Sequence, residues 1–119
     1  MIKIFHNNRC GKSRCAFDLL SAEKAPFETV EYLKNPPSEA EIRDLLRLLD
    51  KKPLDIIRQK EPVFQENFKG KNFSDDEWIA LIAAHPILLE RPIVVVDGKA
   101  WVARDEAALA AIRQKLEAI

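Results

Sequence analysis

The stretch IKIFHNNRCGKSRCAFDLLSAEKAPFETVEYL, residues 2–33, decides the fold. Its first residues, 2–6, alternate apolar and polar side chains and include two isoleucines, a pattern typical of a short strand. Apolar residues then recur at helical spacing and predict a helix from about 11 to 24, and the β-forming residues of 27–33 predict a second strand. A strand, a helix and a strand at this spacing form a βαβ unit, whose strands pair in parallel.

The rest of the chain predicts helices, then a hairpin and one more helix. Ser38 with Glu41 fits a capping box, which marks the first turn of a helix. Ser74 with Glu77 fits a second capping box, and residues 59–73 between the two helices are predicted to be irregular or weakly helical. The predicted elements are a helix at about 39–49, a short helix at 53–58, a helix from Ser74 to Pro86, strands at 93–96 and 99–103 joined at Asp97-Gly98, and a last helix capped by Asp105.

The order of these elements indicates the fold class. A βαβ half and a ββα half, separated by helices, predict a mixed four-stranded sheet flanked by helices. This α/β layout is that of a thioredoxin-like fold with a helical insertion, at about 38–90, between the two halves. Because 119 residues is an ordinary length for one domain, we expect a single domain over residues 1–119.

Composition and charge argue against several classes of function and location. The chain carries 19 basic and 19 acidic residues, so it has no general attraction to nucleic acid or to anionic lipid. No apolar run approaches the ~20 residues of a membrane helix, and residues 1–8 lack the pattern of a signal peptide. We therefore expect a cytoplasmic protein whose two cysteines act as thiols. Two histidines without a matching acidic or cysteine cluster predict no metal site.

The segment HNNRCGKSRC, residues 6–15, is open to three chemical interpretations. A nucleotide phosphate loop requires glycine where His6 stands, so GKS is a weak match to that motif. A disulfide between Cys10 and Cys15 is disfavoured, because positions i and i+5 of one helix lie roughly 8–9 Å apart and a disulfide bridges at most ~7 Å. We expect Cys15 to be a small, half-buried core residue.

The third interpretation, a reactive thiolate at Cys10, is the favoured one. Cys10 ends the loop between strand and helix, so the positive end of the helix dipole would stabilise its thiolate. Ser13 can donate a hydrogen bond to the same sulfur. The alternative is an inert cysteine beside a solvated basic patch. The positive side chains around this cysteine are those of Arg9, Lys12 and Arg14.

Three segments of the sequence resemble one known family. HNNRCGKSR, residues 6–14, resembles the signature H-N-P-x-C-[S/G]-x-S-R of the glutaredoxin-coupled arsenate reductases. HPILLERPIVV, 85–95, resembles the family's H-P-I-L-x-x-R-P-I-V-V, and YLKNPPSEAEI, 32–42, is similar to its Y-L-x-x-P-P-[S/T] stretch. The three segments keep the family's order and span nearly the whole chain. The resemblance implies a thioredoxin fold with a helical insertion, in agreement with the element order.

The resemblance also implies roles for particular residues. Cys10 matches the nucleophile, and His6 lies beside that cysteine in the family, where it has an electrostatic or hydrogen-bonding role. The bond between Arg91 and Pro92 is expected to be cis. The implied protein is a monomer that binds arsenate or a similar oxyanion, uses glutathione as co-substrate and glutaredoxin as partner, and holds no tightly bound cofactor. The implied catalytic residues are Cys10, His6 and Ser13, and the implied oxyanion-binding arginines are Arg58, Arg91 and Arg104, with Arg14 in support.

Two positions depart from the family's pattern. Asn8 replaces the proline of the signature, and Asp105 stands where the family usually has a proline after its last arginine. Asp105 would either weaken anion binding at Arg104 or cap the last helix. Because of these departures, an alternative function remains open: the chain would be a member of the family with other glutathione-linked thiol chemistry. Another branch of the group contains disulfide-stress transcription regulators that bind RNA polymerase, but that branch commonly carries C-x-x-C, and Ser13 occupies the place of its second cysteine.

Overall fold

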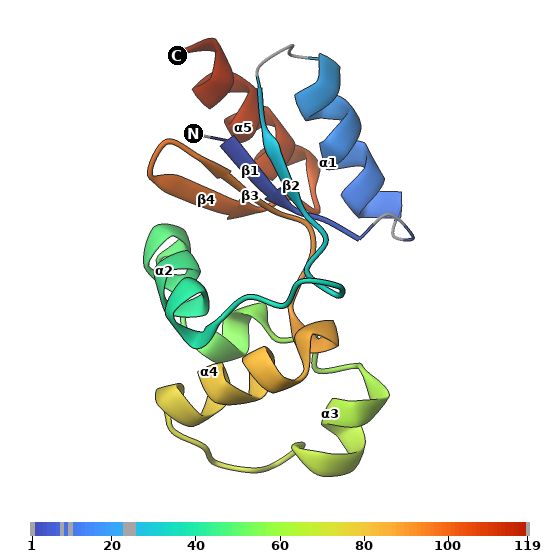
Figure 1. Ribbon diagram of the computed structural model, residues 1–119, viewed down its shortest axis with the longest axis vertical. Coiled ribbons are helices and arrows are strands. Elements are labelled where there is room, and N and C mark those ends of the chain that lie inside the picture. Colours follow the sequence, from blue (N-terminus) through green and yellow to red (C-terminus); the bar gives the residue numbers. More distant parts are fainter. Residues whose placement is uncertain (1, 8, 10, 23–25, 119) are drawn as a thin grey trace. The chain divides into compact units, whose positions relative to one another are not determined.

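The computed structural model describes residues 2–7, 9, 11–22 and 26–118 (Figure 1). The chain forms two compact units, one built from residues 1–35 with 91–119 and the other from residues 36–90. The first unit contains β1 (Ile2–Phe5), α1 (Gly11–Ala22), β2 (Glu28–Val30), β3 (Ile93–Val96), β4 (Lys99–Val102) and α5 (Glu106–Glu117), and the second contains α2 (Glu39–Leu49), η1 (Pro53–Ile56), α3 (Pro62–Asn67), α4 (Asp75–Ala84) and η2 (Pro86–Leu88).

The strands of the first unit form one mixed four-stranded sheet, as predicted, and their order is β2-β1-β3-β4. β1 pairs in parallel with β2 and antiparallel with β3, so that Ile4 lies opposite Thr29 on one side and Val94 on the other. β3 and β4 form an antiparallel hairpin. Its turn residues, Asp97 and Gly98, both have positive φ, 42° and 85°. The tight hairpin turn predicted for Asp-Gly requires positive φ at both central positions.

Helices α1 and α5 cover one face of this sheet (Figure 1). Alternate residues of a strand point to the same face, and residues four apart lie on one side of a helix. Ile2 and Ile4 of β1 therefore meet Ala16 and Leu20 of α1 in one apolar core. This packing places the start of α1 beside the end of β1. The buried core residues of this unit are Ile2, Ile4, Ala16, Leu20, Val94, Val96, Ala103, Ile112 and Leu116.

The second strand is shorter than predicted. We expected it over 27–33, but β2 spans only Glu28–Val30. The last paired residue of β2 is Val30, because its partner strand β1 is also short. The parallel pairing of the two strands ends where the backbone N–H of His6 donates to the carbonyl of Val30 at 2.8 Å. The predicted first helix ends at Ala22, and residues 23–25 of that prediction lie outside the described part of the chain.

The second unit is helical, and both capping boxes are present. Ser38 accepts a hydrogen bond from the N–H of Glu41, and Ser74 accepts one from Glu77, while each glutamate side chain bonds back to its serine N–H. The interval 59–73, expected to be irregular or weakly helical, contains the single helix α3. No helix in the described part of the chain is long and apolar enough to cross a membrane.

Candidate active site

The predicted nucleophile Cys10 lies outside the described residues, as does Asn8. The elements on either side of it are described. β1 ends at Phe5, and α1 begins at Gly11, the residue that follows Cys10 in the sequence. The predicted helix N-terminus immediately after the cysteine is therefore present. Backbone N–H groups at a helix N-terminus favour anions and thiolates in their vicinity.

Ser13 connects the end of β1 to the first turn of α1. His6 Nδ1 lies 2.8 Å from Ser13 Oγ, and the backbone N–H of Asn7 donates to the same oxygen at 2.9 Å. The N–H of Arg9 donates to Asn7 Oδ1 at 3.0 Å, which holds the loop at a third point. Ser13 is fully buried and His6 is 7% exposed. The structure thus brings together two of the predicted catalytic residues, which are seven positions apart in the sequence.

The environment of His6 favours its neutral form. Burial lowers the pKa of His6 below the ordinary value of 6.5, and its contact with Ser13 and the negative charges of Glu31 and Asp18 oppose this effect without overcoming it. Phe17 stacks on the imidazole, with ring centroids 5.1 Å apart and planes 29° from parallel. The apolar ring removes water from one face of the imidazole, which is a cause of this desolvation. Burial thus shifts His6 toward the neutral imidazole.

A pH dependence of stability follows from the lowered pKa of His6. As pH falls through 6.5, the unfolded chain takes up a proton at this position that the folded chain does not, so the free energy of unfolding falls. His6→Gln lacks this titration. We expect the free energy of unfolding of the wild type, minus that of His6→Gln, to decrease from pH 8 to pH 5. Urea denaturation of both proteins across this range measures it, and a difference that grows toward low pH would contradict the neutral assignment.

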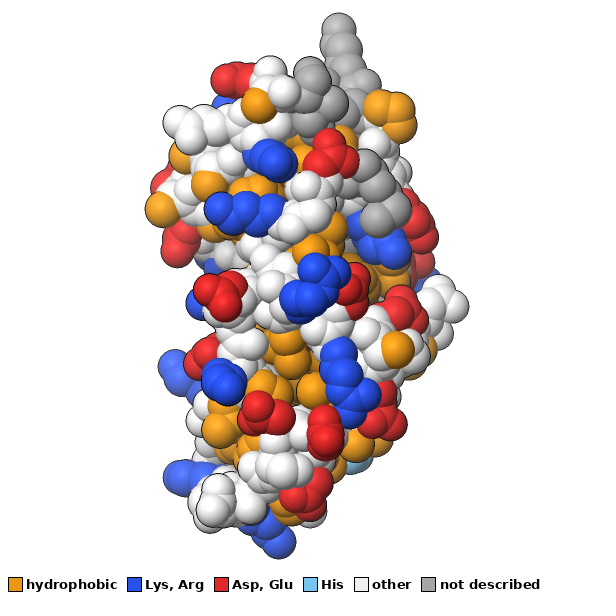
Figure 2. Space-filling model, turned by 90° about the vertical axis from the view of Figure 1, so that its left-hand side faces the viewer, with side chains coloured by type: hydrophobic (Ala, Val, Ile, Leu, Met, Phe, Trp, Pro, Cys, Tyr) orange, Lys and Arg blue, Asp and Glu red, His pale blue; other side chains and the backbone are white. Residues whose placement is uncertain are grey.

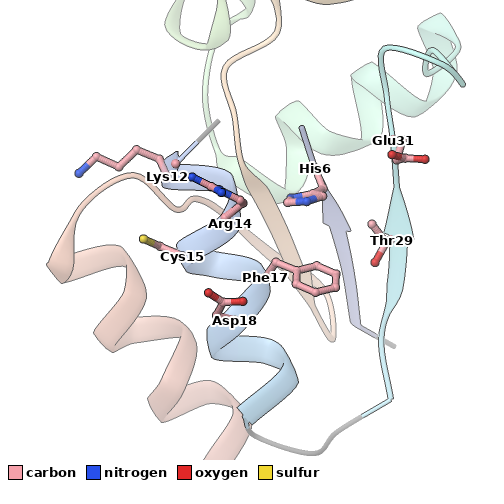
Figure 3. A pocket seen from close by; sticks show the side chains of 9 residues that line it. His6, Lys12, Arg14, Cys15, Phe17, Asp18, Thr29 and Glu31 are labelled. Carbon is pink, nitrogen blue, oxygen red and sulfur yellow. The ribbon is translucent and has the colours of Figure 1, made fainter. Parts of the chain in front are cut away.

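A surface pocket of the first unit borders α1 and β2 (Figure 3). The His6 ring reaches from the end of β1 toward α1, and Phe17 projects from α1 into the same space. Thr29 and Glu31 lie across from them, on β2 and just after it. The pocket therefore adjoins the start of α1. Its lining residues are His6, Gly11, Lys12, Arg14, Cys15, Phe17, Asp18, Thr29 and Glu31.

The prediction of a half-buried Cys15 is wrong, because this cysteine is exposed. Ala16 and Leu20 face the core, and the next position along an α-helix is rotated by about 100°. Cys15 consequently projects from α1 on the side opposite Phe17 (Figure 3). Arg14, predicted to support anion binding, is also exposed and lines the pocket.

Two of the predicted oxyanion-binding arginines lie together in the first unit. Arg104 Nη1 donates to the backbone carbonyl of Arg91 at 3.1 Å. The peptide bond between Arg91 and Pro92 is cis, as the resemblance implied, and the carbonyl of Pro92 accepts from Ala103 N–H at 2.8 Å. The loop before β3 and the end of β4 are thereby held side by side.

Asp105 caps the last helix. Its Oδ1 accepts a hydrogen bond from the N–H of Ala108 at 2.8 Å, and α5 begins at the following residue. A carboxylate that accepts from a free N–H of the first turn stabilises a helix start. Of the two roles considered for this departure from the family's pattern, helix capping is the one seen in the structure.

The third predicted arginine, Arg58, belongs to the second unit and pairs with Glu61. Arg58 Nη1 lies 2.6 Å from Glu61 Oε1, and the two side chains are 24% and 18% exposed. The backbone N–H of Arg58 also donates to the carbonyl of Leu88 at 2.7 Å, which anchors the residue beside η2. A guanidinium has several N–H donors, so this ion pair leaves others available to an anion.

Two contacts of the site residues were not predicted from the sequence. Glu61 follows Arg58 by three residues, a spacing that signals a local ion pair. Phe17 follows Ser13 by four residues on α1, so both lie on the helix face that His6 meets. Both signals were present in the sequence. Among the described residues no group of three or more His, Cys, Asp or Glu side chains is arranged to hold a metal ion.

Charged side chains of both signs are interspersed on one face of the molecule. The face shown in Figure 2 carries lysines and arginines next to aspartates and glutamates, with no extended area of one sign. This distribution agrees with the formal net charge of zero. This face therefore offers no general positive field to an anion.

Comparison with known proteins gives consistent matches along the chain. A model described as the ArsC family matches residues 5–112. An arsenate reductase of Neisseria meningitidis serogroup B is 42% identical over 105 residues, which cover 87% of this chain and 90% of the relative. The uncharacterized protein YfgD of Escherichia coli K12 is 40% identical over 105 residues, which cover 87% of this chain and 88% of the relative.

Solved structures with the same fold also match over nearly the whole chain. A putative arsenate reductase from Yersinia pestis superposes with a TM-score of 0.85 at 30% identity and covers 96% of this chain and 99% of its own. An arsenate reductase from Vibrio cholerae superposes with a TM-score of 0.83 at 33% identity and covers 95% of each chain.

Proposed function

Because the chain belongs to the ArsC family of arsenate reductases, we propose that it reduces arsenate to arsenite with glutathione and glutaredoxin, using Cys10 as the nucleophile. The observation that carries the proposal is the family match over residues 5–112, which includes the cysteine motif and every predicted arginine. The buried contact between His6 and Ser13 supports the proposal. His6 precedes Cys10 in the sequence and Ser13 follows it, so this contact links the residues on either side of the cysteine.

Recognition of the substrate is assigned to arginines. Arsenate is a tetrahedral anion at neutral pH, and guanidinium groups bind such anions through paired, charge-assisted hydrogen bonds. Arg91 and Arg104 lie together in the first unit, and Arg104 is half-buried, so its charge is only partly screened by water. Arg58, in the second unit, is the third arginine that the resemblance implies, and its guanidinium pairs with Glu61.

The reaction transfers an electron pair from thiols to arsenic. The thiolate of Cys10 attacks arsenic(V) and forms an S–As bond, and one arsenate oxygen leaves as water after protonation. The thiolate of glutathione then attacks the sulfur of Cys10. The S–As bond breaks with its electron pair passing to arsenic, which leaves as arsenite, and a mixed disulfide joins Cys10 to glutathione. Glutaredoxin reduces this disulfide by thiol exchange and restores Cys10.

The proposal is tested by turnover of the purified full-length protein. With arsenate, glutathione and glutaredoxin present, and glutathione reductase recycling the oxidised glutathione, we expect arsenite to form and NADPH to be consumed. Omission of arsenate, glutathione or glutaredoxin, one at a time, provides the controls. No arsenite from the complete mixture would contradict the proposal. Arsenate-independent reduction of glutathione adducts would favour the other thiol chemistry instead, and specific retention by purified RNA polymerase would favour a regulator.

A further inference from the structure

Ser13 Oγ has one hydrogen to donate and already accepts one hydrogen bond. The acceptor role is shown by the N–H of Asn7, which can only donate and lies 2.9 Å from the oxygen. Ser13 is fully buried, so its hydroxyl hydrogen has no access to bulk water. A buried hydroxyl that does not donate costs roughly 1–3 kcal/mol. The hydrogen therefore requires an acceptor within the protein.

Among the described residues, the candidate acceptor is His6 Nδ1. This nitrogen lies 2.8 Å from Ser13 Oγ, and within the described ranges 2–7, 9, 11–22 and 26–118 no other acceptor is placed for the hydroxyl. An imidazole nitrogen that accepts a hydrogen bond carries no hydrogen, so in the neutral ring the hydrogen is on Nε2. The opposite assignment, with Nδ1–H donating to Ser13, would leave the serine hydroxyl without an acceptor among the described residues.

The imidazole of His6 borders the pocket beside α1 (Figure 3). His6 lines the pocket, whereas Ser13, which holds Nδ1, does not. Phe17 covers one face of the ring, which restricts rotation of the ring about the Cβ–Cγ bond. The charged residues that line the pocket with His6 are Asp18, Lys12 and Arg14 on α1 and Glu31 after β2, and Glu31 Oε2 lies 3.7 Å from Lys34 Nζ. Among the described residues no carboxylate hydrogen-bonds to the ring, and the nearby charges of Glu31 and Asp18 offset the desolvation of an imidazolium only in part.

We propose that Ser13 is a positioning residue that holds His6 as the neutral Nε2–H tautomer, so that His6 presents one hydrogen-bond donor to an oxygen of the oxyanion bound beside the start of α1. This inference rests on the proposed function for the identity of the oxyanion. It differs from an electrostatic role, because a neutral imidazole orients the anion through one N–H without adding positive charge. The charge needed for binding then comes from the arginines and the helix N-terminus.

The tautomer is measured directly by NMR on the intact protein labelled with ¹⁵N-histidine. The chain has two histidines, and His85 in the second unit is the internal reference. Long-range correlations from the ring C–H protons should show a protonated Nε2 and an unprotonated Nδ1 for His6 at pH 7. Ser13→Ala should produce a mixture of tautomers at His6 and leave His85 unchanged. A protonated Nδ1 in the wild type would overturn the proposal, whether or not the variant folds.

Two substitutions of His6 then test the donor itself. The side-chain NH₂ of glutamine reaches the position of Nε2, and that of asparagine reaches only the position of Nδ1. We expect His6→Gln to retain arsenate affinity and His6→Asn to lose about fivefold, the effect of one neutral hydrogen bond. Arsenate should also shift the Nε2 resonance of wild-type His6. Arsenate that binds without moving this resonance would overturn the inference, whereas binding with the expected shift but no turnover would contradict only the proposed function.

Discussion

Cys10→Ser is expected to abolish arsenite production, with a loss of at least about 1,000-fold in turnover. The serine hydroxyl is a far weaker nucleophile than a thiolate at neutral pH. It is also unable to form a disulfide with glutathione, so the step that passes an electron pair to arsenic has no counterpart. The measurement is arsenite formed in the presence of arsenate, glutathione and glutaredoxin, together with mass spectrometry for a glutathione adduct on the protein.

Cys15→Ser is the matched control for that experiment. The same sulfur-to-oxygen change is made five residues away, at an exposed cysteine that projects from α1 on the side opposite Phe17. Because Cys15 has no part in the proposed reaction, turnover should stay within about twofold of the wild type, a small effect typical of exposed positions. Equal losses in the two variants would show that both thiols are required, and full activity in Cys10→Ser would remove that cysteine from the mechanism.

The second large effect concerns stability. Leu20→Ala should lower the free energy of unfolding by about 2–5 kcal/mol, the usual range for removing a buried leucine from a well-packed core. Leu20 is 1% exposed and packs among the residues that join α1 to β1 and β3. Alanine is a good helix former, so the loss reflects packing rather than weakened helix formation. Urea denaturation followed by circular dichroism gives the difference.

Leu33→Ala provides the comparison for this measurement. Leu33 belongs to the same unit but is 42% exposed, so the same truncation leaves little or no cavity. A loss of under about 1 kcal/mol is expected, since much of this side chain is already in water. If both substitutions lowered the free energy of unfolding by the same amount, the packing of α1 on the sheet would not explain the loss in Leu20→Ala.

Most of the fold could be predicted because its signals are local. The two capping boxes each span four residues, and the Asp97-Gly98 turn is marked by the two residues that form it. Alternation in β1 and helical spacing in α1 likewise extend over a few residues. The errors arise where the outcome depends on a distant neighbour: β2 is shorter than predicted because its partner strand ends, and Cys15 is exposed because the rotation of α1 against the sheet decides which face is buried.

The same distinction between local and long-range signals applies to the candidate site. The sequence by itself determined the element order, the helix that begins after Cys10, and the family to which the motifs belong, because each of these is encoded in short segments read in order. Only the tertiary structure decided that Ser13 contacts His6, that Arg104 reaches the carbonyl of Arg91, and that burial lowers the pKa of His6. These depend on how the strands and helices pack, because hydrogen bonds and desolvation act over a few ångströms in space, whatever the separation along the chain.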